Sequence, residues 1–240
     1  MLAYDRSQLL ISLHVPKTAG TSLRQMLQGW FGENLAFHYR GDRGEAPAVA
    51  EARPGLCVHG HFNRCRGLGA LEYYPGASQF IVFLRNPFER FVSQWRYLHY
   101  QQRSGVLVPE LDDRPTFAQW LDRRRAASEA AEDPFSFIAQ LPRPLTLDAA
   151  AHGPFGPEFL FVGLVERYAE SASALGAVLG FPRADPAHLN RASEARRRGD
   201  PTDDFSALRR THERAFPLEY AVYEAAERRL AATLDQRAAA

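Results

Sequence analysis

"LLISLHVPKTAGTSLRQMLQGWF", residues 9–31, contains the transitions that decide the fold. Its first seven residues form a short apolar run with the length of a β-strand. "PKTAGTS" then interrupts the run. Apolar residues at the spacing of one helix face follow, namely Leu23, Met26, Leu27 and Trp30. The stretch therefore predicts a strand, a loop and a helix that begins near Thr21 or Ser22.

The loop between this strand and this helix has the composition of an anion-binding loop. A helix start directs unpaired backbone amides and its positive dipole end into the loop, and Gly20 lets a ligand approach the backbone. Lys17 precedes Gly20 by three residues, whereas the triphosphate loop G-x-x-x-x-G-K-[ST] has its lysine after the last glycine. Lys17 is also the only lysine among 29 Lys and Arg residues, which favours a role that arginine cannot fill. The alternative interpretation is an ordinary strand-to-helix turn.

"SQFIVFLRNPFERFVSQWRYLHY", residues 78–100, repeats the pattern of strand, loop and helix. "FIVFL" is an all-apolar run, typical of a strand that is buried on both faces of a parallel sheet. Asn86 is in position to cap the following helix, and Pro87 suits its first turn. The expected buried stripe of this helix consists of Phe88, Phe91, Val92, Trp95 and Leu98.

Arg85 ends this second strand, and Ser93 follows eight residues later, about two turns into the helix. Ligands of open parallel sheets gather at the carboxyl ends of the strands, so we expect Arg85 on the same sheet edge as "PKTAGTS". Two anion sites on one edge suggest a ligand with two separated phosphates. The alternative for Arg85 is an ion pair at the strand end, for example with Glu89.

Strands and helices alternate along the rest of the chain. Further strands are predicted within residues 35–40, 55–62 and 159–166, and further helices over 117–127, 167–181 and 217–234. The pattern predicts an α/β, three-layer, P-loop-like fold with a central, mainly parallel sheet flanked by helices. We expect residues 1–240 to form a single domain. The proline-rich region 103–157 is expected to be irregular and to act as a lid or a ligand-binding loop.

Composition restricts the partners of the chain. A formal net charge of +1 over 240 residues gives no general attraction to nucleic acid or to a membrane surface. No apolar run is long enough for a membrane span and no basic leader precedes the first strand, so we expect a cytoplasmic protein. Cys57 and Cys65 are too few for a disulfide framework, and their spacing is not that of a metal site, so both are expected to be reduced.

Together, "HVPKTAGTS" and "FLRNPFERFVS" resemble the 5'-phosphosulfate loop and the 3'-phosphate motif of PAPS-dependent sulfotransferases, and "FVGLVERYAES" is similar to a segment of many members. The resemblance implies PAPS as donor, PAP as product and a hydroxyl-bearing acceptor. It implies that the 5'-phosphosulfate is held by Lys17, Thr18, Ala19, Gly20, Thr21 and Ser22. It implies that Arg85 and Ser93 hold the 3'-phosphate. The family's basic C-terminal loop is only approximated by "RRRG", 196–199, for which a solvated basic surface is the better interpretation.

Sulfuryl transfer to an alcohol needs a base for the hydroxyl proton and a positive charge at the leaving oxygen, for which Lys17 is suited. His59 and His61 end a predicted strand two residues apart, so both imidazoles are expected to face one pocket. The pair resembles that of heparan sulfate and uronyl 2-O-sulfotransferases, which implies a carbohydrate type. We predict His61 as the base with His59 assisting, and the reverse assignment stays open. The alternative to a catalytic pair is two buried, hydrogen-bonded histidines. No metal is expected, although H-x-H binds zinc in some proteins. His14 is interpreted as structural.

Two other functions remain compatible with this pattern. A P-loop small-molecule kinase would share the fold, but it needs a lysine next to Ser or Thr and an acidic residue for magnesium. A non-catalytic nucleotide-binding protein of the same fold is expected to have lost the loop or the base, and both are present. The identity of the acceptor, whether a carbohydrate or another small alcohol, and the oligomeric state stay open.

Overall fold

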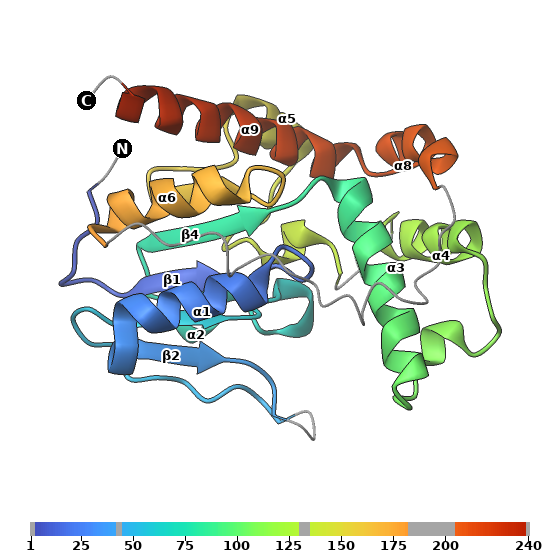
Figure 1. Cartoon of the computed structure of the whole chain (residues 1–240), viewed down its shortest axis with the longest axis horizontal. Coiled ribbons are helices and arrows are strands. Elements are labelled where there is room, and N and C mark those ends of the chain that lie inside the picture. Colours follow the sequence, from blue (N-terminus) through green and yellow to red (C-terminus); the bar gives the residue numbers. More distant parts are fainter. Residues whose placement is uncertain (1–2, 42–44, 130–134, 182–204, 239–240) are drawn as a thin grey trace.

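The computed structural model describes residues 3–41, 45–129, 135–181 and 205–238. Its strands are β1 Leu10–Leu13, β2 Leu35–His38, β3 Cys57–Gly60, β4 Gln79–Leu84 and β5 Phe159–Leu164. They form one sheet in the order β2-β3-β1-β4-β5, and every pair of neighbours is parallel (Figure 1). The prediction of a central, mainly parallel sheet is confirmed.

Helices flank this sheet, so the predicted α/β class is also confirmed (Figure 1). The helices are α1 Gly20–Phe31, α2 Ala70–Tyr73, α3 Pro87–Arg103, α4 Phe117–Glu129, α5 Leu147–His152, α6 Tyr168–Leu179, α8 Arg209–Ala215 and α9 Pro217–Ala238. Both α6 and α9 pack on β5, whereas α3, α4 and α8 group together beside the sheet (Figure 1). The helices therefore form two groups, one packed on the sheet and one packed around α3.

After β1 the chain continues to a strand on one side of the sheet, and after β4 it continues to a strand on the opposite side. The connection through α1 leads from β1 to β2 on one side, whereas the chain after β4 leads to β5 on the other side. Since β1 and β4 are themselves neighbours, with Leu13 beside Val82, their carboxyl ends flank the crevice at which open α/β sheets bind ligands. The fold thus brings the two loops that the sequence singled out to one place.

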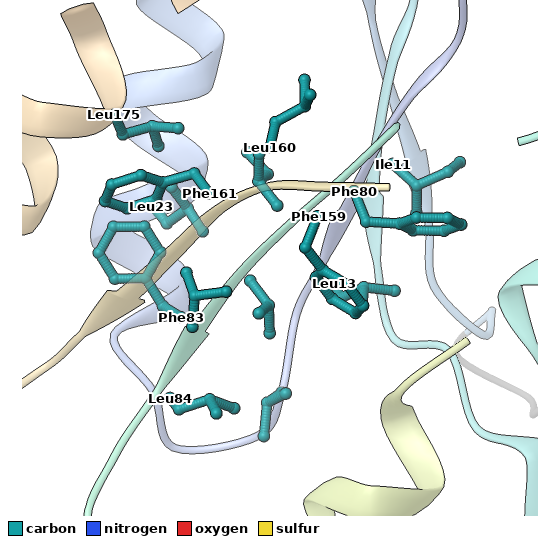
Figure 2. Packing of buried hydrophobic residues seen from close by; sticks show 14 of the residues in the cluster. Ile11, Leu13, Leu23, Phe80, Phe83, Leu84, Phe159, Leu160, Phe161 and Leu175 are labelled. Atoms are coloured by element: carbon teal, nitrogen blue, oxygen red, sulfur yellow. The ribbon is translucent and has the colours of Figure 1, made fainter. Parts of the chain in front are cut away.

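The main hydrophobic core lies between the sheet and its helices. All six residues of β4 and all six of β5 are buried, as expected for strands covered on both faces. Figure 2 shows how Phe83, Phe161 and Leu175 pack together beside Leu23 of α1. Burial of this apolar surface is the main contribution that holds the sheet and its helices together.

A second hydrophobic cluster surrounds the inner face of α3. It contains the predicted stripe of that helix, together with Trp120 of α4 and Phe216 next to α8. The start of α3 is also as predicted, because the Asn86 side chain accepts a hydrogen bond from the Glu89 amide and Pro87 occupies the first turn. The helix that carries Ser93 is therefore anchored on one side and presents its other side to the loop after β1.

The region 103–157 is more regular than its prolines indicate. Besides α4, which was predicted, it contains α5 and a 3₁₀ turn at Phe137–Gln140. Each starts at a side-chain cap, since Thr146 accepts from the Ala149 amide and Ser136 from the Ile138 amide. Among the helices described, none is both long and apolar enough to cross a bilayer. Cys57 is buried, Cys65 is exposed, and neither forms a disulfide.

Candidate active site

The loop between β1 and α1 has a strained backbone. Lys17 and Ala19 adopt left-handed conformations, with φ angles of 69° and 61°, which are uncommon for residues with a Cβ atom. Ala19 stands at the helix N-cap position and has no side chain that could pair with the first amides of α1. Alternating left-handed residues before a helix form a concave arrangement of N–H groups that suits an anion.

Two predicted loop contacts have local partners. The Thr18 side chain is buried, and its hydroxyl donates to the Val15 carbonyl at 2.8 Å, so it closes the turn. A Cβ atom on Gly20 would lie 1.6 Å from Nε2 of His14. The glycine is therefore required by the His14 ring as well as by any ligand above the loop.

Lys17 extends toward α3. Its Nζ atom lies 3.8 Å from the centre of the Tyr97 ring, a cation–π contact. Tyr97 follows Ser93 by one helical turn, so the two residues share the face of α3 that is turned to the loop. The structure thus places the Lys17 ammonium beside the face of α3 that carries Ser93.

Arg85 directly follows β4 and is half-buried. Burial lowers the pKa of Arg85, and the charge of Arg96 on α3 lowers it further, while Glu166 and Glu89 act in the opposite direction. Within the described residues, no carboxylate oxygen lies within 4 Å of the Arg85 guanidinium, because Glu89 pairs with Arg209 instead. The predicted alternative, an Arg85–Glu89 ion pair, is therefore not formed.

Arg96 is a residue that sequence reasoning missed. It follows Ser93 by three positions, which puts both on one side of α3, and its side chain is exposed. Its charge acts on Arg85 although the two are eleven residues apart in sequence. Its i, i+3 spacing from Ser93 is the sequence feature that could have indicated Arg96 as a neighbour of Ser93.

His59 and His61 both pack against His14, as expected for residues two apart at a strand end. The His59 ring is fully buried, its Nδ1 is hydrogen-bonded to the Ser12 hydroxyl at 2.9 Å, and its Nε2 is buried without a partner. Burial, aided by the charges of His61 and Arg24, lowers the pKa of His59 to about 3. His59 is therefore a neutral, enclosed group.

His61 differs from His59 because its ring is only partly buried. Its Nδ1 lies 2.7 Å from the backbone carbonyl of His14, which can only accept, so Nδ1 carries the proton and Nε2 is the basic nitrogen. Burial lowers the pKa of His61, while the hydrogen bond to His14 acts in the opposite direction. His61 is thus neutral near pH 7 and able to take up a proton at Nε2.

His14, interpreted from sequence as structural, lies at the centre of this histidine cluster. Its ring stacks on His61 at 4.2 Å and on His59 at 5.1 Å between ring centroids. Its Nδ1 is hydrogen-bonded to the Tyr39 hydroxyl at 2.8 Å. Tyr39 follows β2, so residues from three strands meet here.

A profile of the sulfotransferase family matches residues 1–221 of the chain. The protein belongs to the sulfotransferase family. Among solved structures, that of mouse sulfotransferase SULT7A1 complexed with PAP is similar, with a TM-score of 0.49 and 16% sequence identity. That comparison covers 82% of this chain and 68% of the mouse chain. No curated protein matches the chain.

Two further expectations for this sulfotransferase concern the edges of the site. Residues 196–199, the weak counterpart of the basic C-terminal loop, lie outside the described residues. In the part of the chain that is described, no group of three or more His, Cys, Asp or Glu side chains could hold a metal ion. The three histidines at the site are joined to each other and to Tyr39 and Ser12.

Proposed function

We propose that this sulfotransferase transfers the sulfuryl group of PAPS to a hydroxyl acceptor and releases PAP. The observation that carries the proposal is the strand order β3-β1-β4. His61 follows β3, the Lys17 loop follows β1 and Arg85 follows β4, so these groups lie in a row along one sheet edge. Such a row would suit PAPS, which has a phosphosulfate at its 5' end and a phosphate at its 3' end, with the base beside the phosphosulfate.

The donor would be held at its two phosphate ends. At the 5' end, the backbone amides of Thr18 to Ser22 and the Lys17 ammonium would face the phosphosulfate, supported by the left-handed loop and the uncapped helix start. At the 3' end, Arg85 and Ser93 would bind the phosphate. Arg96 joins them in this proposal, because its charge acts on Arg85 and a pair of guanidinium groups favours an anion.

His61 is the proposed base, and His59 is assigned a supporting position. The proposal is supported by the fixed tautomer of His61, whose unprotonated Nε2 belongs to a partly exposed ring. His59 is enclosed, and its Nδ1 is bound to Ser12, so an acceptor has no access to it. We therefore propose that His59 assists only by packing in the histidine cluster, and not by contacting the acceptor.

The reaction follows from these assignments. The acceptor hydroxyl gives its proton to Nε2 of His61 as its oxygen forms a bond to sulfur. The bond between sulfur and the bridging oxygen breaks, and its electron pair stays on the 5'-phosphate of PAP. The Lys17 ammonium would neutralise the charge that develops on that oxygen, a position where a compact cation differs from a planar guanidinium.

The acceptor is proposed to bind beside the loop after β3. Arg64, three residues after His61, donates from Nε to the Leu141 carbonyl and from Nη2 to the Ile138 carbonyl, which ties region 103–157 to the segment that follows His61. Arg64 also lines a cavity of about 420 Å³ together with Ser136 and Leu145. The acceptor in our proposal is a carbohydrate or a small alcohol.

The residues at this edge of the sheet also disfavour a small-molecule kinase activity. β4, the neighbour of β1, is followed by Arg85 rather than by the carboxylate that a magnesium-dependent kinase needs there. PAP binding would separate the two activities, because a kinase has no use for a 3'-phosphate. The proposal requires PAP to bind more tightly than ADP.

The test combines calorimetric PAP binding with transfer of label from ³⁵S-PAPS to a panel of sugars and small alcohols. His61→Ala should lower turnover by about 10²-fold or more and leave PAP affinity within about twofold. His152→Ala is the matched control, because His152 is an exposed histidine on α5. Full activity of the His61 variant would refute the base assignment, and absence of PAP binding to the unaltered protein would refute the donor.

A further inference from the structure

The three imidazoles at the end of β1 and β3 form a continuous stack with His14 in the middle. Its plane is inclined by 14° to that of His59 and by 23° to that of His61. The centroid distance to His61, 4.2 Å, is the shorter of the two and leaves no room for water between the rings. One face of the His61 ring is therefore covered by His14.

The His14 ring is held from its other sides as well. Tyr39 binds its Nδ1, and the ring edge at Nε2 lies against Gly20, where a Cβ atom would overlap it. The backbone carbonyl of the same residue accepts the Nδ1 proton of His61. His14 therefore contacts the base through its ring and its backbone, and it contacts the first residue of α1 through its edge.

We propose that His14, fixed by Tyr39, is a positioning residue that keeps the His61 ring oriented and dry next to the phosphosulfate loop. This inference rests on the proposed role of His61 as the base. His14 itself exchanges no proton with the substrate. Its function is to connect the loop that holds the donor with the group that deprotonates the acceptor, so that both keep a constant distance.

The charges around the stack are consistent with neutral rings. Burial lowers the pKa of His14 far below its ordinary value, and the neighbouring His61, His59, Lys17 and Arg24 lower it further. Burial raises the pKa of Tyr39, so its hydroxyl stays protonated. The stack is thus surrounded by positive or neutral groups from β1, β3, α1 and the chain after β2, and the ring of His14 acts on His61 by excluding water.

The proposal has a defined effect on pH dependence. Burial holds the pKa of His61 below 6.5, so the base is unprotonated at neutral pH and is lost as pH falls through that lowered value. Removing the His14 ring would admit water to His61 and raise its pKa toward 6.5. The acid limb of kcat/KM would then move to higher pH. A phenyl ring in place of the imidazole would exclude water equally and leave the limb where it is.

The experiment measures His61 directly, by NMR titration of ¹⁵N-histidine-labelled protein, alongside turnover and PAP affinity. The His61 signal is assigned from a His61→Asn sample. In His14→Ala we expect the midpoint of His61 to rise toward its ordinary value, turnover to fall severalfold because the ring loses its support, and PAP affinity to stay within about threefold. In His14→Phe the midpoint should stay within about 0.3 pH units of the original.

Tyr39→Phe removes only the hydroxyl and keeps the proposal testable if His14→Ala does not fold. It should lower turnover severalfold without changing PAP affinity, because the His14 ring loses its Nδ1 partner. An unchanged His61 midpoint in folded His14→Ala, an equal shift in His14→Phe, or full turnover in Tyr39→Phe would overturn the proposal. If instead His61→Asn is fully active while the midpoint still shifts, the base assignment fails and the coupling between the rings stands.

Discussion

Replacement of Gly20 by alanine tests the contact between the donor loop and the histidine cluster. The new Cβ atom would lie 1.6 Å from Nε2 and 2.2 Å from two ring carbons of His14. The ring cannot easily withdraw, because Tyr39 binds its other nitrogen and His61 lies against its face. We therefore expect Gly20→Ala to lower the free energy of unfolding by about 1–3 kcal/mol, the usual cost of overpacking.

The same substitution should behave differently once the His14 ring is absent. Gly20 has ordinary helical backbone angles, since it is not among the residues with positive φ, so alanine itself is tolerated there. Alanine in a helix is favoured over glycine by about 0.5–1 kcal/mol. In a His14→Ala background, Gly20→Ala should therefore be neutral or stabilising, which gives a coupling energy of about 2 kcal/mol or more between the two sites.

Urea unfolding of the four proteins in this cycle, followed by circular dichroism, measures that coupling. Turnover provides a second readout, because a displaced His14 ring no longer supports His61. An equal cost of Gly20→Ala with and without the His14 ring would refute the packing argument. It would mean that the ring moves freely and that the glycine is needed for another reason.

Two further substitutions test the site, and another two compare the buried ion pair between Arg90 and Glu219 with an exposed one. Lys17→Arg should lower turnover by about 10²-fold while PAP affinity, measured by calorimetry, changes only a few fold; an unimpaired enzyme would contradict the role of the ammonium. Arg85→Met should weaken PAP binding by at least about tenfold, since it removes a charge-assisted phosphate contact, and unchanged affinity would mean that the 3'-phosphate binds elsewhere. Glu219→Gln leaves the fully buried Arg90 without its carboxylate, whose Oε2 lies 3.1 Å from Nη2, and should cost about 3 kcal/mol of unfolding free energy. Asp113→Asn, in an exposed ion pair, should cost less than about 1 kcal/mol in the same assay, and similar losses for both would refute the distinction.

Much of the fold could be predicted because the strands other than β2 are fully buried. Runs such as "FIVFL" have no polar residue, and the loops after them begin with recognisable signals such as Asn86 and Pro87. Such patterns depend on a few neighbouring residues. The positions of β1, β4, α1 and α3 could therefore be predicted from the sequence.

The contacts within the histidine cluster could not be predicted from the sequence. Residues 14, 39 and 61 meet because β1, β2 and β3 run in parallel in the order β2-β3-β1, and strand order is a property of the whole chain. His14 precedes Pro16 at the end of a strand, a context that resembles any core histidine. The Thr18 hydroxyl likewise had two possible partners, the ligand or the turn, and only coordinates distinguish them.

The ion pair between Arg90 and Glu219 links the donor site to the end of the chain. Arg90 and Ser93 lie one turn apart on α3, while Glu219 belongs to the first turn of α9 and also accepts from the Ser136 hydroxyl. Local detachment of α9 would leave the Arg90 charge buried without its counter-ion, and this would loosen the wall that carries Ser93. Given the proposed role of Ser93, linkage makes the effect reciprocal: a stably docked α9 would strengthen donor binding, and a bound donor would make α9 harder to detach.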